Sequence, residues 1–322
     1  MSDRSFPRLL GDIGGTNARF AWQAREGAPL TVHANYACAA HPGLLEAICQ
    51  FLADHRLERP AACAIGIANP VTGDEIRMTN HAWSFRVSAL KRELGVERVH
   101  VLNDFTALAM SLPALTPDEL LQIGPGRPAP GAPRAVIGPG TGLGVSGLID
   151  TARGEQVAIA GEGGHVTMAA ADDHEAAILA RLRWRFGHVS AERVVSGPGL
   201  VNLYRSIAEE AGSRPHETFG AADILEYCDD DPLCHQALLM FCGFLGSAAG
   251  NLALTLGARG GVYLGGGIVP RIAERLPYSP FRQRFEGKGR FRGYLAEVPT
   301  WVIRSDLSPA LLGASRSLDQ LQ

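Results

Sequence analysis

The chain has 322 residues, of which 46% are hydrophobic and 20% charged, and its formal net charge is −3. This balance is that of a globular protein, and it excludes an intrinsically disordered chain, a coiled coil and a collagen-like fibre. No basic excess is available for nucleic-acid binding through counterion release, so we expect no nucleic-acid partner.

Secreted, disulfide-stabilised, zinc-stabilised and membrane proteins are also disfavoured. Residues 1–8 lack the apolar core of a secretion signal, and the six cysteines include no CxxC pair, so neither a disulfide framework nor a structural zinc site is expected. Residues 232–258 contain no charged side chain except histidine, but they hold several polar residues and four glycines. A membrane interior cannot satisfy that many polar groups. We therefore expect a cytoplasmic protein with no membrane partner, in which this segment is a buried helix.

The first half of the chain alternates between strand and helix patterns. Residues 9–10 lead into a glycine turn at 11–16, and residues 17–22 then alternate apolar and polar side chains, which predicts a β-hairpin. Apolar runs at 62–68 and 98–102 predict two further strands. A helix is expected to begin after the second of these, with Asn103 or Asp104 as its N-cap.

The second half begins with a similar hairpin. Residues 135–137, the glycine turn 138–142 and residues 143–149 repeat the first hairpin about 125 residues later, which indicates an internal duplication. Helices are expected at 176–185, 200–210 and 232–256, and strands at 261–264 and 301–303. A last helix is expected from about 309. Alternating strands and helices predict an α/β fold, and the hairpins predict mixed sheets.

Three glycine turns follow apolar strands, at 11–16, 138–141 and 265–267. Backbone N–H groups in such turns can surround a phosphate. None of the turns is a P-loop, and none has the form of a Rossmann dinucleotide site. The first also contains Asp12 and Thr16, which supply the carboxylate and hydroxyl that Mg²⁺ and phosphate require.

Six motifs in a fixed order then resemble one family. They are Gly11-Asp-Ile-Gly-Gly-Thr-Asn-Ala-Arg19, Leu102-Asn-Asp-Phe105, Gly140-Thr-Gly-Leu-Gly144, Gly161-Glu-Gly-Gly-His165, Ser196-Gly-Pro-Gly-Leu200 and Gly265-Gly-Gly-Ile268. This set resembles the ATP-dependent bacterial glucokinase family, of the sugar kinase/Hsp70/actin superfamily, over residues 8–320. Residues 166–175 contain no cysteine, which separates the chain from the related repressor/ORF/kinase group and its zinc motif.

The resemblance implies a two-lobed actin-like ATPase fold, which is ribonuclease H-like. A smaller N-terminal α/β domain would span residues 1–115 and a larger one 116–322, with the C-terminal helix able to pack back on the smaller domain. It also implies ATP and Mg²⁺ as cofactors, D-glucose as the sugar substrate and a homodimer.

The resemblance also assigns roles to residues. Asp104 matches the catalytic base, and Asp12 would hold Mg²⁺ through water. The sugar ligands would be Asn80, Asn103, Asp104, Glu162, His165 and Glu192. The ATP-binding residues would be Gly11, Asp12, Ile13, Gly14, Gly15, Thr16, Gly138, Gly140, Thr141, Gly265, Gly266 and Gly267.

The residues themselves support these roles. Phosphoryl transfer needs positioning, charge neutralisation and a base for the acceptor hydroxyl. Asp104 lies where a strand ends and a helix begins, a place that favours an ionised carboxylate. Each residue also has a purely structural explanation. Asp104 could simply be an N-cap, Glu162 and His165 could lie in a solvated loop, and Glu192 could mark the start of a helix. Lys288, Arg290 and Arg292 form either a phosphate contact or a solvated basic loop.

The resemblance, supported by these residues, therefore implies an ATP:D-glucose 6-phosphotransferase. Two alternatives remain at this point: a kinase of another hexose on the same fold, and a sugar-binding regulator without turnover.

Overall fold

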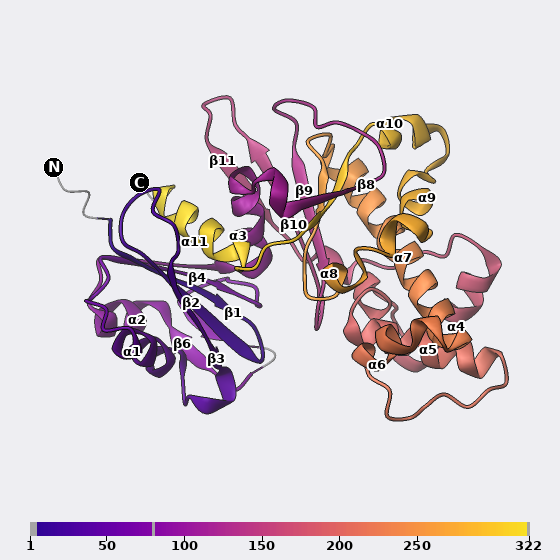
Figure 1. The fold of residues 1–322 in the computed structure, drawn as a ribbon, viewed down its shortest axis with the longest axis horizontal. Coiled ribbons are helices and arrows are strands. Elements are labelled where there is room, and N and C mark those ends of the chain that lie inside the picture. Colours follow the sequence, from indigo (N-terminus) through magenta and orange to yellow (C-terminus); the bar gives the residue numbers. More distant parts are fainter. Residues whose placement is uncertain (1–4, 79–80, 321–322) are drawn as a thin grey trace. The chain divides into compact units, whose positions relative to one another are not determined.

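A computed structural model describes residues 5–78 and 81–320 of the chain (Figure 1). Its contacts divide the chain into two compact units. The first comprises residues up to 115, residues 156–160 and residues from 305 onward, and the second comprises 116–155 and 161–304. The C-terminal segment therefore belongs to the first unit.

The first unit is built on a five-stranded mixed sheet with the strand order β3-β2-β1-β4-β7. Strand β2 is antiparallel to both β1 and β3, whereas β1, β4 and β7 are parallel. This confirms the first predicted hairpin. The elements are β1 (Arg8–Ile13), β2 (Asn17–Gln23), β3 (Val32–Ala37), α1 (Leu44–Asp54), β4 (Ala62–Ile67), β5 (Glu75–Arg77), β6 (Ser84–Arg86), α2 (Val87–Leu94), β7 (Arg98–Asn103), α3 (Asp104–Ser111), β11 (Gln156–Ala160) and α11 (Pro309–Asp319).

The central strand β1 is buried on both faces of this sheet. Leu9 of β1 packs in one apolar cluster with Phe51 of α1, and the next residue, Leu10, packs in another with Leu311 of α11. Consecutive residues of a strand point to opposite faces, so a central strand covered on both sides is buried at every position, here including the charged Arg8 and Asp12. This explains why residues 8–13 are all buried.

The second unit contains a mixed sheet in which strands follow the order β10-β9-β12-β13-β8. Strands β9 and β10 form the second predicted hairpin, β9, β12 and β13 run parallel, and β8 is antiparallel to β13. The elements are β8 (Leu120–Ile123), β9 (Arg134–Pro139), β10 (Leu143–Asp150), α4 (Asp173–Phe186), α5 (Gly197–Glu210), α6 (Ala221–Glu226), α7 (Pro232–Leu256), β12 (Val262–Leu264), α8 (Val269–Ile272), α9 (Phe281–Glu286), α10 (Arg292–Ala296) and β13 (Thr300–Ile303).

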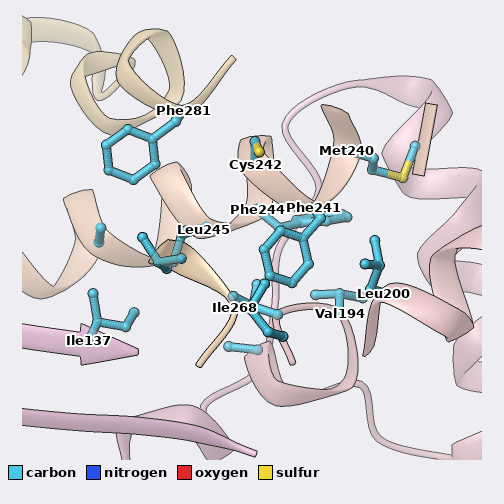
Figure 2. Close-up of a cluster of buried hydrophobic side chains, with 14 of the residues drawn as sticks. Ile137, Val194, Leu200, Met240, Phe241, Cys242, Phe244, Leu245, Ile268 and Phe281 are labelled. Carbon is cyan, nitrogen blue, oxygen red and sulfur yellow. The ribbon is translucent and has the colours of Figure 1, made fainter. Parts of the chain in front are cut away.

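Helix α7 forms the centre of the second unit. Asp231 caps its start by accepting hydrogen bonds from the N–H groups of Leu233 and Cys234, at 2.7 and 3.1 Å, and Gly257 ends it with a φ of 62°. Figure 2 shows Phe241 and Phe244 of this helix inside the apolar cluster. By length and composition α7 could cross a membrane, but 72% of its most apolar 18 residues are buried within the structure. Its environment is that of a core helix, as the sequence predicts.

Candidate active site

In the first unit, the parallel strands β1, β4 and β7 place the predicted Mg²⁺ ligand and the predicted base at the same edge of one sheet. Asp12 of β1 is in register with Gly66 of β4, and the neighbouring Ile67 is in register with Asn103 of β7. Two strand spacings separate β1 from β7, which is roughly 10 Å. The carboxyl ends of parallel strands are where α/β proteins bind ligands.

The Asp12 carboxylate is held by two side chains. Its Oδ2 accepts a hydrogen bond from Ser308 Oγ at 2.7 Å and lies 3.2 Å from the Arg19 guanidinium, which is its cross-strand neighbour. The sequence predicts no role for Arg19 or Ser308. No local pattern could reveal Ser308, because 296 residues separate it from Asp12.

In the first glycine turn, only the backbone N–H groups at the tip are available to a ligand. Gly11 and Ile13 are buried in the central strand, and the Gly14 N–H closes the turn on Asn17 O at 2.9 Å. Within the described part of the chain, the N–H groups of Gly15 and Thr16 donate to no backbone acceptor. These two N–H groups are therefore the ones that can bind an anion.

Asn103 and Asp104 lie where β7 passes into α3. Asn103 is the N-cap, because its Oδ1 accepts hydrogen bonds from the N–H groups of Phe105 and Thr106 at 2.9 and 3.1 Å. Asp104 is the first residue of the helix, and its Oδ1 also accepts from the Phe105 N–H, at 2.9 Å. The sequence left open whether Asn103 or Asp104 caps the helix, and the structure shows that Asn103 does. The Asp104 carboxylate is held beside it at the helix N-terminus.

Two glycines allow α3 to lie where it does. A Cβ at Gly66 would come within 3.5 Å of the Asp104 Cα and 3.3 Å of the Ala107 Cβ. A Cβ at Gly313 of α11 would come within 1.7 Å of the Ala107 carbonyl oxygen. The position of Asp104 therefore depends on close packing of α3 on β4 and α11.

In the second unit, the other two glycine turns lie against each other. A Cβ at Gly138 would lie 2.6 Å from the Gly265 carbonyl carbon, and one at Gly266, which has a φ of 78°, would lie 2.4 Å from Pro139 O. Only glycine tolerates both this conformation and this contact. Gly140 and Gly267 face open space, and Thr141 is exposed. The structure thus assembles one glycine-lined surface from motifs that are about 125 residues apart in the chain.

The two segments that carry the predicted sugar ligands of this unit both contact Leu143, the first residue of β10. Glu192 Oε2 accepts a hydrogen bond from the Leu143 N–H at 2.8 Å. The loop with Glu162 and His165 packs on the same residue, because a Cβ at Gly164 would come within 2.1 Å of Leu143 O. Glu162 and His165 are both exposed, and Glu192 is half-buried. Glu192 lies in a short 3-10 helix, Ala191–Arg193, that contacts the 3-10 helix Gly163–His165.

The remaining predicted residues have different environments. Asn80 lies outside the described residues. Lys288 is not part of a solvated loop: it is half-buried, and its Nζ donates a hydrogen bond to Ser247 O of α7 at 3.2 Å. Burial and then the charge of Arg284 lower the pKa of Lys288. Arg290 and Arg292 are exposed.

The donor set around Asp12 suits Mg²⁺ held mainly by phosphate and water. Among the described residues no group of three or more His, Cys, Asp or Glu side chains could hold a metal ion. Mg²⁺ in kinases commonly uses one or two carboxylates together with substrate phosphates. Asp12 fits this requirement because its Oδ2 is fixed, while its Oδ1 forms no hydrogen bond within the described residues.

Comparisons with known proteins agree on one family. A sequence model of the family described as Glucokinase matches residues 9–321. The curated glucokinase of Aromatoleum aromaticum is 53% identical over 320 residues, covering 98% of this chain and 95% of that protein.

Solved structures show the same relationship. A glucokinase from an Antarctic psychrotroph is 36% identical with a TM-score of 0.87, over 98% of this chain and 99% of that one. A ROK family glucokinase from Streptomyces griseus, solved with glucose and AMPPNP, shares the fold, with 19% identity, a TM-score of 0.67 and coverage of 98% and 100%.

Proposed function

Because the chain belongs to the glucokinase family, we propose that it transfers the γ-phosphoryl group of ATP to the 6-hydroxyl of D-glucose, with Asp104 as the general base. The family match and the relatives show a glucokinase, which is an enzyme that phosphorylates glucose. The roles of individual residues are our proposal.

The position of Asp104 is the observation that carries the proposed mechanism. Its carboxylate is anchored at the N-terminus of α3 while Asn103 caps that helix. The helix N-terminus favours an ionised carboxylate. As the oxygen of the 6-hydroxyl forms a bond to the γ-phosphorus and the bond to ADP breaks, Asp104 accepts the hydroxyl proton.

Other residues bind and orient the substrates. Glu162, His165 and Glu192 offer acceptors and a donor for the remaining sugar hydroxyls. The turn tips Gly15–Thr16 and Gly140–Thr141, each a half-buried glycine followed by an exposed threonine, supply N–H and hydroxyl groups for the phosphates. Asp12 would hold Mg²⁺ through water, and the ion would neutralise charge on the phosphates.

The decisive experiment replaces Asp104 with Asn. This change removes the base and keeps the side-chain size, so kcat should fall by ~10²–10⁴-fold. A thermal-shift assay should still detect glucose binding. Asp118→Asn, in the first turn of the exposed 3-10 helix Pro117–Glu119, is the matched control and should keep wild-type kcat. If Asp104→Asn kept more than about half of the wild-type kcat, Asp104 would not be the base.

A sugar panel tests the substrate assignment. A site that hydrogen-bonds each hydroxyl leaves polar groups unpaired when one hydroxyl is inverted, so galactose should be a poor substrate. Faster turnover of fructose or mannose than of glucose would favour the other hexose kinases. Sugar binding without ADP formation would indicate a regulator.

We also propose the finer features of the fold. The hairpin followed by two parallel strands occurs in both units, as β2-β1-β4-β7 and β10-β9-β12-β13, which supports an internal duplication of the actin-like, ribonuclease H-like kind. On this proposal, the unit with residues up to 115 is the smaller domain and the C-terminal helix α11 belongs to it.

Three further features stay proposals: a requirement for Mg²⁺, a cytoplasmic location and a homodimer. The side chain of Trp184 on α4 is 91% exposed, and aromatic side chains of this kind are enriched in subunit interfaces. Sedimentation of wild type and Trp184→Ser tests the dimer. Removal of Mg²⁺ by a chelator, followed by its return, tests the metal requirement.

A further inference from the structure

The main chain of Leu143 joins three parts of the second unit. Its N–H donates to the carboxylate of Glu192, at 2.8 Å. Its carbonyl oxygen lies against Gly164, where a Cβ would approach to 2.1 Å. The residues just before it form the second glycine turn. The turn assigned to phosphate and both loops assigned to sugar therefore meet at one residue.

The segment from Glu192 to Gly197 holds the turn at two points. The side chain of Glu192 binds its end through Leu143, and the Gly197 N–H donates to Gly140 O at 2.8 Å. Ser196 fixes the segment between them, because its Oγ donates to Glu192 O and accepts from the Gly199 N–H, at 2.8 and 2.9 Å. Ser196 is buried. The turn therefore cannot shift without disturbing the Glu192 segment.

The two oxygens of the Glu192 carboxylate have different tasks. Oε2 accepts from Leu143, whereas Oε1 forms no hydrogen bond within the described residues. A carboxylate offers about four lone-pair directions. A sugar hydroxyl can therefore donate to Oε1 without displacing the backbone N–H, and binding it would restrict the same carboxylate that holds the turn.

We propose, resting on the proposed function, that Glu192 is a positioning residue for the nucleotide as well as a sugar ligand. Glu192 thereby couples the binding of the two substrates. A sugar hydroxyl bound to Oε1 restricts the carboxylate, whose Oε2 holds the second glycine turn through Leu143. Conversely, a phosphate bound to this turn orders the carboxylate for the sugar. Such coupling is reciprocal, so each substrate must tighten the binding of the other by the same factor.

The experiment measures the affinity of AMPPNP by calorimetry, with and without saturating glucose. Wild type should bind the nucleotide at least about fivefold more tightly with glucose, the lower end of common coupling. Glu192→Ala removes the hydrogen bond between the Leu143 N–H and a charged group. The affinity of this variant for AMPPNP without sugar should therefore fall by about tenfold or more. The effect of glucose on nucleotide binding should disappear in this variant.

Two matched variants separate this role from alternatives. Glu192→Gln keeps an oxygen for the Leu143 N–H, so it should restore nucleotide affinity without sugar to within about twofold of wild type. Glu162→Ala should lose affinity for glucose and keep wild-type nucleotide affinity without sugar, because the contact of its loop with Leu143 is made by Gly164.

The outcomes distinguish this inference from the proposed function. If the wild-type enzyme is active and Glu192→Ala binds AMPPNP as tightly as wild type, the inference alone is overturned. Glu192 is then only a sugar ligand. Equal losses in Glu192→Ala and Glu192→Gln also overturn it, since the retained oxygen would then be irrelevant. A wild type that neither binds nor phosphorylates glucose overturns both.

Discussion

Replacement of Gly313 with Ala should disable the enzyme through the packing of α11 on α3, although no substrate-binding role is proposed for Gly313. Gly313 lies in α11, where a Cβ would approach the Ala107 carbonyl oxygen to 1.7 Å, its carbonyl carbon to 2.7 Å and the Ser111 N to 3.0 Å. All three atoms belong to the backbone of α3, so no side-chain rotation can relieve the contact. An ordinary contact needs roughly 3.5 Å, and the helices would have to separate locally by ~2 Å.

This displacement acts directly on Asp104, three residues before Ala107 in the same eight-residue helix. A misplacement of ~1 Å at a reacting group can cost ~10²-fold in rate. We therefore expect Gly313→Ala to lower kcat by about that factor or more. Overpacking should also destabilise the fold by ~1–3 kcal/mol, and the KM for ATP should change little.

The assay is steady-state kinetics with a melting curve for each variant. Gly293→Ala is the matched control, because Gly293 lies in the helix α10 and a Cβ added there would have no neighbouring atom within 4 Å. Alanine there should leave kcat unchanged and slightly raise the melting temperature. Wild-type kcat and melting temperature in Gly313→Ala would refute the argument that this packing sets the position of Asp104, the proposed base.

Two further predictions concern side chains for which the sequence predicts no role. Ser308→Ala removes the 2.7 Å hydrogen bond to Asp12, so the Mg²⁺ concentration for half-maximal activity should rise on the order of tenfold. The KM for glucose should stay constant and Ser308→Thr should rescue the effect; an unchanged Mg²⁺ titration would remove Ser308 from the site. Burial lowers the pKa of His100, whose Nδ1 lies 2.8 Å from Ser317 Oγ, below its ordinary 6.5. Because the unfolded chain takes up this proton at higher pH than the folded chain, stability is fully present above pH 6.5 and declines below it. The melting temperature between pH 7.5 and 5.5 should therefore fall more in wild type than in His100→Gln, and parallel curves would contradict this.

Local patterns were sufficient for the elements that build the site. Both hairpins, the strands β4 and β7, and the helix α7 lie where the sequence patterns predict them, and α5 begins three residues earlier than expected, at Gly197. Strand β3 was missed although its burial alternates along its six residues, because it is a half-exposed edge strand with polar and small residues. Its apolar positions are too few to dominate the pattern.

Contacts that depend on the tertiary fold could not be found in this way. The partner of the Glu192 carboxylate is a backbone N–H 49 positions earlier in the chain, and a backbone group leaves no signature in side-chain types. The choice between Asn103 and Asp104 as the helix cap was also open, since both residue types cap helices well. The extended ψ of 145° at Asn103 settles it, and that angle is a property of the folded backbone.

The carboxylates of Asp12, Glu192 and Asp104, proposed to bind substrates or Mg²⁺, share one arrangement of hydrogen bonds. In Asp12 and Glu192, one carboxylate oxygen accepts hydrogen bonds from the protein while the other forms none within the described part of the chain. In Asp104, the carboxylate oxygen Oδ1 accepts a hydrogen bond from the N–H of the next residue, Phe105. A group oriented in this way loses little conformational freedom when a substrate binds, and it needs little reorganisation as charge develops during phosphoryl transfer. The same bonds make each residue part of the local structure, so a substitution to alanine removes both a proposed ligand and a structural hydrogen bond. Variants that keep one acceptor oxygen, such as Glu192→Gln, are therefore the ones that can separate binding from positioning in this enzyme.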